Sequence, residues 1–380
     1  MTGGAPERSG LVARWESLGR PLRHVPRWAA ALLLLATFAA CLWSVPAVDS
    51  YGAFSREAND ARLEAGGRAD FDLYEAIDRR IAAGESYYSA ALDEQRTSRF
   101  PTKPFVTVRP PTLAWSSLVL GLDGWRVLAA ALWLASVIGL YAALAGGVRK
   151  PERTAAALCA AAAGAVAGIK EVGLSHEIVA GLLVSASLAL YRRERWWPSL
   201  VLAAGALAVR EMALPFLLLW GAFAALEQRW REFAAVAAVI LLFAAGMALH
   251  AQAVIAQQLP GDLVSPGWTG FQGPALPLFG IVTVTLLQML PVWLAAPLAV
   301  LPMLGWLGLG GRLGLFATLW FAGYALAVGL FARQENFYWL ALLIPAYGAG
   351  LALVPRSLAD LTAALRGRLP RAAEPGSPTG

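Results

Sequence analysis

Charged residues and cysteine are both scarce in this sequence. Only 15% of its 380 residues are charged and 58% are hydrophobic, so the polar surface that a water-soluble domain of this length requires is missing. The two cysteines, Cys41 and Cys159, each lie inside an apolar run. They support neither a disulfide framework nor a thiolate metal site, and we expect them to be packing residues.

The signature motifs of soluble enzymes are absent as well. The sequence contains no P-loop, no dinucleotide-binding glycine motif, no GxSxG nucleophile elbow and no HExxH metalloprotease motif. Coupling to ATP is therefore not expected. No second His or Cys stands at zinc-ligand spacing from His176, and we predict neither a metal nor a cofactor.

What the sequence does contain is a series of long apolar runs. Several exceed the roughly 18 residues that a spanning helix needs. The first run lacks an early cleavage site and similar runs follow it, so we interpret it as a retained helix rather than a secretory signal. We predict an all-α polytopic membrane protein with about ten transmembrane helices. The expected spans are residues 28–48, 124–146, 154–170, 176–191, 198–210, 212–226, 233–252, 277–309, 313–332 and 337–355.

Basic residues indicate how these helices are oriented. The formal charge is +6, but Arg and Lys sit in short clusters between apolar runs rather than on one face, which argues against a nucleic-acid partner. The clusters precede the first span and follow every second one, whereas the opposite short loops carry only Lys170, Arg210 and Arg333. The positive-inside rule therefore predicts that both termini are cytoplasmic.

This topology divides the chain into three parts. Residues 1–27 are expected to form a cytoplasmic N-terminal segment, 28–355 a transmembrane domain, and 356–380 a cytoplasmic, partly disordered tail. Within the transmembrane domain, residues 49–111 form a large outer loop and residues 253–276 a second one.

The large outer loop holds eleven of the 25 acidic residues of the chain and nine of its basic ones. A bilayer does not accept that density of charge, so the loop must face water. Within it, Phe71, Tyr74, Ile77 and Ile81 follow one another at spacings of three, three and four residues. This spacing predicts an amphipathic helix over 71–83 that lies on the membrane surface.

Two apolar segments are expected to be interrupted. The short fifth and sixth spans meet at Arg210 and Glu211, which predicts a helical hairpin. The eighth span contains Pro291, Pro297 and Pro302, and these prolines should kink or break it.

Polar residues from five separate segments fall at the outer ends of helices, and this coincidence is the main indication of function. Asp70, Asp72 and Tyr74 lie in the outer loop. A carboxylate at that depth could act as a general base toward an acceptor hydroxyl. The alternative is an acidic helix start that the helix dipole favours.

The other segments carry both charges. His176 and Glu177 follow Ser175, so they indicate either a near-membrane site or a helix start that Ser175 caps. Arg210 and Glu211 could neutralise each other, or Arg210 could face an anionic ligand.

Arg109 and Arg333 are the remaining candidate cations. Arg109 beside Pro110 could hold a phosphate or mark the headgroup boundary. Arg333 and Asn336 could also bind a phosphate, while the aromatic residues that follow them, 337–339, are equally explained as an interfacial belt.

In order and content, these elements resemble the GT-C class of membrane glycosyltransferases, including the glycosyltransferase 87 and mannosyltransferase families, which use polyprenyl-phosphate sugars. Four stretches carry the resemblance, and it spans about residues 28–355. They are the acidic motif at 69–74, the Gly-x-x-Tyr-Tyr turn at 82–88, the Arg-Pro-Pro return at 109–113 and the outer segment from Arg333 to Pro345.

The resemblance implies particular roles for these residues. Asp70 would take the catalytic aspartate position, with Asp72 as a rival two residues away and Glu177 as a second acidic position. Arg210 and Arg333 would contact the donor phosphate. The wider set of substrate-binding candidates is Tyr74, Arg109, His176, Arg210, Glu211, Arg333 and Asn336. The chain departs from larger members in lacking a soluble C-terminal domain and in its smaller number of helices.

The function expected from this resemblance is transfer of a sugar from a polyprenyl-phosphate donor to an extracytoplasmic glycan, lipid or protein, at a bacterial inner membrane. The alternatives are a transporter or flippase of a lipid-linked intermediate and a non-catalytic membrane component. A transporter should carry its functional charges near the bilayer midplane. The charges of this chain gather instead at the expected outer face.

Overall fold

A computed structural model of the protein describes residues 10–64, 70–268 and 270–367. The described residues are almost entirely helical. Their only β-type pairing is an isolated bridge between Lys103 and Val264. The all-α prediction is therefore confirmed for this part of the chain.

The helices alternate long apolar segments with short or broken ones. In chain order the α-helices of the described residues are α1 (Leu11–Ser17), α2 (Arg27–Glu64), α3 (Asp70–Ala82), α4 (Tyr87–Thr97), α5 (Thr112–Ala143), α6 (Lys150–Ala163), α7 (His176–Leu190), α8 (Trp197–Val209), α9 (Leu214–Leu226), α10 (Trp230–Ile255), α11 (Ala275–Thr283), α12 (Val292–Leu309), α13 (Gly311–Phe331) and α14 (Val354–Leu365). The 3-10 segments used below are η6 (Glu211–Ala213), η7 (Leu286–Met289), η8 (Gln334–Leu343) and η9 (Ala346–Leu353).

Five helical segments of the described chain are long and apolar enough to cross a membrane. They belong to α2, α5, α10, α12 and α13. The pair formed by η8 and by η9 with α14 is bent by 74° and counts as a sixth if it is taken as one span. This set of helices indicates a multi-pass membrane protein.

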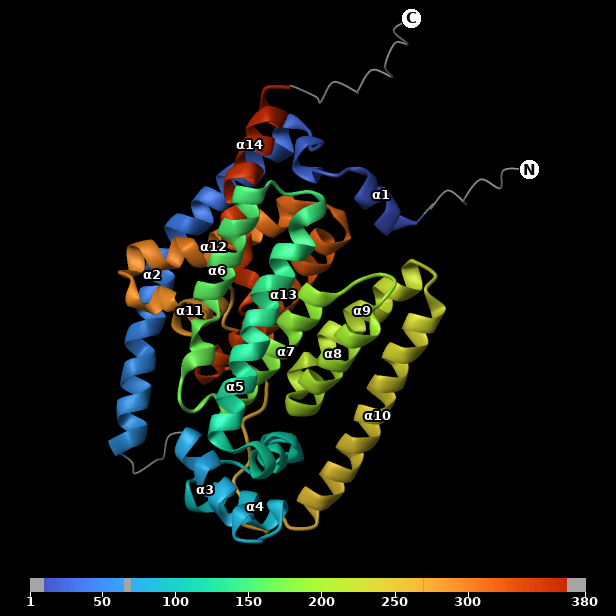
Figure 1. Ribbon diagram of the computed structural model, residues 1–380. Coiled ribbons are helices and arrows are strands. Elements are labelled where there is room, and N and C mark those ends of the chain that lie inside the picture. The colour runs from blue at the N-terminus through green and yellow to red at the C-terminus, as the bar shows by residue number, and fades with distance from the viewer. Residues whose placement is uncertain (1–9, 65–69, 269, 368–380) are drawn as a thin grey trace, which may run out of the picture.

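The two ends of the molecule carry different elements (Figure 1). α1 and α14 lie at one end, called here the terminal end, and α3 and α4 lie at the opposite end, called the loop end. α2 runs along one side and α10 slants along the other, so that the shorter helices lie between them. In that interior, α7 packs against α5 and α8.

The start of the large loop differs from its prediction. α2 continues to Glu64 instead of ending at residue 48, with Pro46 inside it. The predicted amphipathic helix is present as α3, but its buried face is Leu73, Ile77 and Ile81, while Phe71 is 37% exposed. The face is rotated because α3 packs on α4 in a small apolar core of its own rather than facing lipid alone.

The expected helix interruptions are present. α8 and α9 form the predicted hairpin, with the break at Arg210. The eighth expected span is divided into α11 and α12 just before Pro291, whereas Pro297 and Pro302 remain inside α12. The last expected span, 337–355, consists of 3-10 turns rather than one α-helix, and Pro345, which lacks an amide hydrogen, separates η8 from η9.

At the terminal end, Asp360 of α14 ties the first and last described segments together. Its side chain is fully buried and accepts hydrogen bonds from Arg20 Nε at 2.7 Å and Arg23 Nε at 2.5 Å. Replacing Asp360 with Asn removes the charge that both guanidinium groups face. We expect the free energy of unfolding to fall by about 2 kcal/mol, measured by thermal unfolding in detergent. Asp123→Asn, at a 96% exposed side chain, should have little effect.

Candidate functional site

Polar side chains from four separate elements, joined by Tyr338 of η8, meet toward the loop end of the bundle. α3, the turn before α5, the start of α7 and the break between α8 and α9 each contribute to this group, which we call the polar cluster. Its members are Asp70, Tyr74, Arg109, His176, Glu177, Arg210, Glu211 and Tyr338. All but Tyr338 are candidates that the sequence analysis named.

Glu177 is the centre of the polar cluster. Its Oε1 accepts a hydrogen bond from Arg210 Nε at 2.7 Å and lies 3.6 Å from Arg109 Nη2. Ser175 caps the helix by accepting a hydrogen bond from the Ile178 amide at 3.4 Å. The turn is therefore both a helix start capped by Ser175 and part of a site, because the capped helix start places Glu177 between two arginines.

The break between α8 and α9 turns Arg210 inward. Arg210 has extended backbone angles, and its residue surface is only 1% exposed. Its Nη1 donates to Glu211 Oε1, and its guanidinium lies 5.8 Å from the ring centroid of Trp339. Arg210 is thus held by two carboxylates and an aromatic face, and the pair does not merely neutralise itself.

Arg109 is fixed by the chain that surrounds it. Tyr87 donates its hydroxyl hydrogen to the Arg109 carbonyl oxygen at 2.6 Å, and the two prolines that follow restrict the backbone leading into α5. The side chain is 16% exposed. Arg109 therefore presents a guanidinium group of defined position beside Glu177.

Tyr74 connects α3 to this ionic centre. Its ring lies 4.9 Å from that of His176, measured between centroids. Burial raises the pKa of the Tyr74 hydroxyl, while the nearby Arg109 guanidinium lowers it and the charges of Asp70 and Glu177 raise it further. Asp70, one helical turn before Tyr74, is thereby placed at the edge of the polar cluster.

Three buried polar atoms of the polar cluster have no hydrogen-bond partner among the described residues. They are Arg109 Nε, His176 Nδ1 and Glu211 Oε2. Buried polar atoms are nearly always paired with protein, water or a ligand. Together they offer a charged donor, a carboxylate acceptor and an imidazole nitrogen that can donate or accept a hydrogen bond, depending on the tautomer. This combination suits a ligand with an anionic group and hydroxyls.

Asp72, Arg333 and Asn336 lie outside the contacts that hold the polar cluster together. Asp72 is exposed on the first turn of α3. Arg333 Nη1 pairs with Glu335 Oε1 at 3.1 Å, and Asn336 Oδ1 accepts a hydrogen bond from the Arg333 amide at 3.3 Å. Asn336 is therefore occupied in shaping its own turn.

Tyr338 is the member of the polar cluster that the sequence analysis did not select. It was grouped with the aromatic residues of an interfacial belt, but it interacts electrostatically with Arg109, Glu177 and Asp70. Its neighbour Trp339 is only 5% exposed, so the belt interpretation is wrong there. The 3-10 geometry of η8 turns these rings inward, and no helical periodicity in the sequence could indicate that.

An apolar groove of about 620 Å³ has Pro110, the residue after Arg109, in its lining. It runs between the start of α5, the C-terminal half of α8 and the part of α10 from Val239 to Ala253. Among the residues that line it are Tyr88, Pro110, Pro111, Trp115, Leu207, Phe243 and His250. Such a groove suits a hydrocarbon chain whose polar end lies near Arg109.

Asp78 gives the loop end a pH dependence. Burial raises the pKa of this carboxyl from 3.8 to about 6, and a hydrogen bond from Ser117 opposes the shift. Between those pH values the unfolded chain releases the proton and the folded chain keeps it, so stability falls as pH rises to about 6.

Asp78→Asn should therefore raise the free energy of unfolding above pH 6 by on the order of 1 kcal/mol, a value reduced for the partial exposure of this carboxyl. The gain should vanish below pH 4. Thermal unfolding in detergent at several pH values measures it. Glu75→Gln, at an exposed position of the same helix, should leave the profile unchanged.

Comparison with protein-family models, curated proteins and solved structures gives no match to this chain. The class that the fold and site define is a multi-pass helical membrane protein with a buried ionic site beside an apolar groove.

Proposed function

We propose that the protein is a membrane glycosyltransferase that moves a sugar from a polyprenyl-phosphate donor to a glycan, lipid or protein acceptor. The observation that carries the proposal is the polar cluster, in which Arg109 and Arg210 meet carboxylates, together with the apolar groove whose lining includes Pro110, the residue after Arg109. A polyprenyl-phosphate sugar has the same order of parts, with a long apolar chain, a phosphate and a sugar.

In the proposed reaction, Asp70 is the general base. It takes the proton of the acceptor hydroxyl while that oxygen forms a bond to the anomeric carbon of the sugar. The bond between the anomeric carbon and the phosphate oxygen breaks, and polyprenyl phosphate leaves with the bonding electrons. The reaction as written consumes no nucleotide and no redox partner.

Arg109 is the proposed contact of the departing phosphate. Its buried Nε has no hydrogen-bond partner among the described residues, and a guanidinium can bind two phosphate oxygens at once. Arg210, which donates a hydrogen bond to Glu177, is proposed to add to the positive charge that stabilises the departing phosphate. We keep Arg333 and Asn336 as candidate contacts for the outer part of the donor or acceptor.

Glu177 has a different proposed role from Asp70. Because its Oε1 faces two guanidinium groups, it is suited to hold them in place rather than to accept a proton. His176 and Tyr74, whose rings are in tilted contact at the edge of the polar cluster, are proposed to contact sugar hydroxyls. Glu211 completes the site by holding Arg210.

For the membrane topology we propose ten spans, with the short helices α6 to α9 and the bent pair η8 and η9 adding to the long ones. Both termini then lie in the cytoplasm of a bacterial cell, and residues 49–111 and 253–276 lie outside its inner membrane. A cytoplasm-active reporter inserted after residue 265 should be inactive, and one placed after residue 148 should be active. Activity at 265 contradicts the topology.

One observation favours a second candidate, a transporter of a lipid-linked intermediate. Arg210 is 1% exposed at a break between two apolar helices, and broken helices with buried charges also form transporter sites. The two functions differ in whether the sugar–phosphate bond is broken.

The deciding experiment uses the purified full chain in vesicles with a radiolabelled polyprenyl-phosphate sugar and candidate acceptor lipids or oligosaccharides. The glycosyltransferase proposal expects label on the acceptor, or slow release of free sugar, with formation of polyprenyl phosphate. Movement of intact donor across the vesicle without bond cleavage supports the transporter instead. A protein that neither cleaves nor moves the donor contradicts both.

A further inference from the structure

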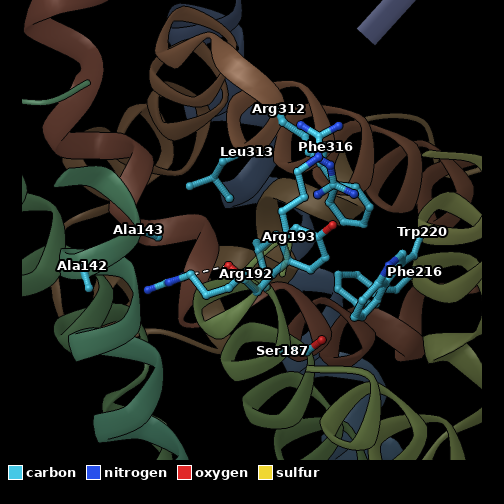
Figure 2. A pocket seen from close by; sticks show the side chains of 12 residues that line it. Ala142, Ala143, Ser187, Arg192, Arg193, Phe216, Trp220, Arg312, Leu313 and Phe316 are labelled. Carbon is cyan, nitrogen blue, oxygen red and sulfur yellow. Dashed lines mark hydrogen bonds between the residues drawn. The ribbon is translucent and has the colours of Figure 1, made fainter. Parts of the chain in front are cut away.

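A second cavity, of about 260 Å³, has no residue of the polar cluster in its lining, and its Arg193 lies close to Glu16 of α1 at the terminal end. It opens between the ends of α5 and α7, the middle of α9 and the start of α13. We call it the basic pocket, and Figure 2 shows its lining. Its lining includes Tyr191, Arg192, Arg193, Phe216, Arg312 and Phe316.

The basic pocket carries more positive than negative charge. Glu227 Oε1 lies 3.4 Å from Arg193 Nη2 and 3.1 Å from Arg312 Nε, so two guanidinium groups share one carboxylate. Glu16 of α1 is 3.9 Å from Arg193. Arg192, which points away from the other two in Figure 2, donates to the carbonyl oxygens of Ala189 and Tyr191 at 3.2 and 2.7 Å. Glu232 accepts hydrogen bonds from Tyr191 and Trp220 of the lining and pairs with Arg229, so four guanidinium groups face three carboxylates.

Arg312 has a donor to spare. Its guanidinium carbon lies 4.2 Å from the ring centroid of Tyr191 and 5.8 Å from that of Phe316. These aromatic faces and Glu227 fix its plane. Its Nη2 is buried and has no hydrogen-bond partner among the described residues. A buried charged donor held in place without a partner indicates a missing acceptor.

The surroundings place the basic pocket at the depth of lipid headgroups. Trp197 opens α8 just after Arg193, and Trp230 opens α10 just after Arg229, whose Nη2 donates to the Arg193 carbonyl oxygen. Both tryptophans are 61% exposed. Exposed tryptophans at helix ends are typical of the membrane interface.

We propose that the basic pocket binds the phosphodiester headgroup of an anionic phospholipid, with its acyl chains along the apolar wall. Arg312 Nη2 would donate to a phosphate oxygen, the exposed Arg192 would add positive charge on the other side of the pocket, and the rings of Phe216 and Phe316 would contact the first methylene groups. Basic pockets between spanning helices are suited to such headgroups. The site does not depend on the catalytic proposal, because none of its residues belongs to the polar cluster.

The test titrates the purified full chain in mixed micelles with phosphatidylglycerol and, separately, phosphatidylcholine, and reads binding by native mass spectrometry. Wild-type protein should prefer phosphatidylglycerol. Arg192→Gln and Arg312→Lys should each weaken its binding about fivefold. Arg312→Lys keeps a positive charge beside Glu227 and removes the planar guanidinium group, including the Nη2 donor that has no partner. Thermal unfolding confirms that each variant is folded.

Arg195→Gln is the matched control, since Arg195 is exposed in the same loop but does not line the basic pocket. It should change binding by less than about twofold. Equal losses in all three variants, or none in Arg192→Gln and Arg312→Lys, overturn the proposal. Displacement of the lipid by an equal concentration of inorganic phosphate also overturns it, because the site would then take a free anion rather than a phospholipid.

Discussion

Replacement of Asp70 by Asn is expected to lower the rate of sugar transfer by about 100-fold or more while donor binding survives. Asn keeps the shape of the side chain and cannot accept the proton of an acceptor hydroxyl. Asp70 begins α3 and lies one turn from Tyr74, whose ring centroid is 4.9 Å from that of His176. The purified variant, assayed with a polyprenyl-phosphate sugar at saturating donor, gives the rate, and a binding titration gives the affinity.

Asp72→Asn is the matched control for this prediction. Asp72 lies on the same first turn, carries the same charge and is exposed, so its variant should keep most of the activity. If the Asp72 variant loses activity and the Asp70 variant keeps it, the assignment is displaced by two residues. If neither variant changes the rate, α3 does not supply the base.

The helix pattern could largely be predicted because hydrophobic runs and proline act locally. The hairpin at Arg210 and the break before Pro291 follow from short spans and a missing amide hydrogen, which are visible in the sequence. The course of α2 could not be predicted in the same way. Its extension to Glu64 continues through charged residues. Because charged residues are costly inside a bilayer, their presence predicted a loop there.

The polar cluster could be assembled only in part from the sequence. Arg210 was selected because a charge inside an apolar run is costly. Glu177 was selected because it lies beside a predicted helix start. That these two side chains lie 2.7 Å apart depends on the packing of α7 against α8, which no spacing along the chain specifies. The same holds for Arg333, whose predicted place on the outer side suggested a phosphate contact, although its partner in the structure is Glu335.

Glu177→Gln should have the largest effect on stability. The substitution leaves the guanidinium groups of Arg109 and Arg210 facing a neutral amide, and Arg210 is almost fully enclosed by protein. Removing one partner of a buried ion pair costs about 3–5 kcal/mol, and here Arg109 loses the carboxylate beside it while Arg210 keeps Glu211 alone. We expect a correspondingly lower unfolding temperature in detergent. Glu335→Gln, at a side chain that is 61% exposed beside Arg333, should change stability little.

A double substitution separates the ion pair from other effects of changing Glu177. In Glu177→Gln with Arg210→Gln the buried carboxylate and the buried cation are removed together, and two amides of similar size can hydrogen-bond to each other. This variant should recover part of the stability that Glu177→Gln alone loses, since removing both partners of a buried pair costs less than removing one. It also remains measurable if the single variant does not fold. Additive losses in the double variant would mean that Glu177 and Arg210 do not interact in the folded protein.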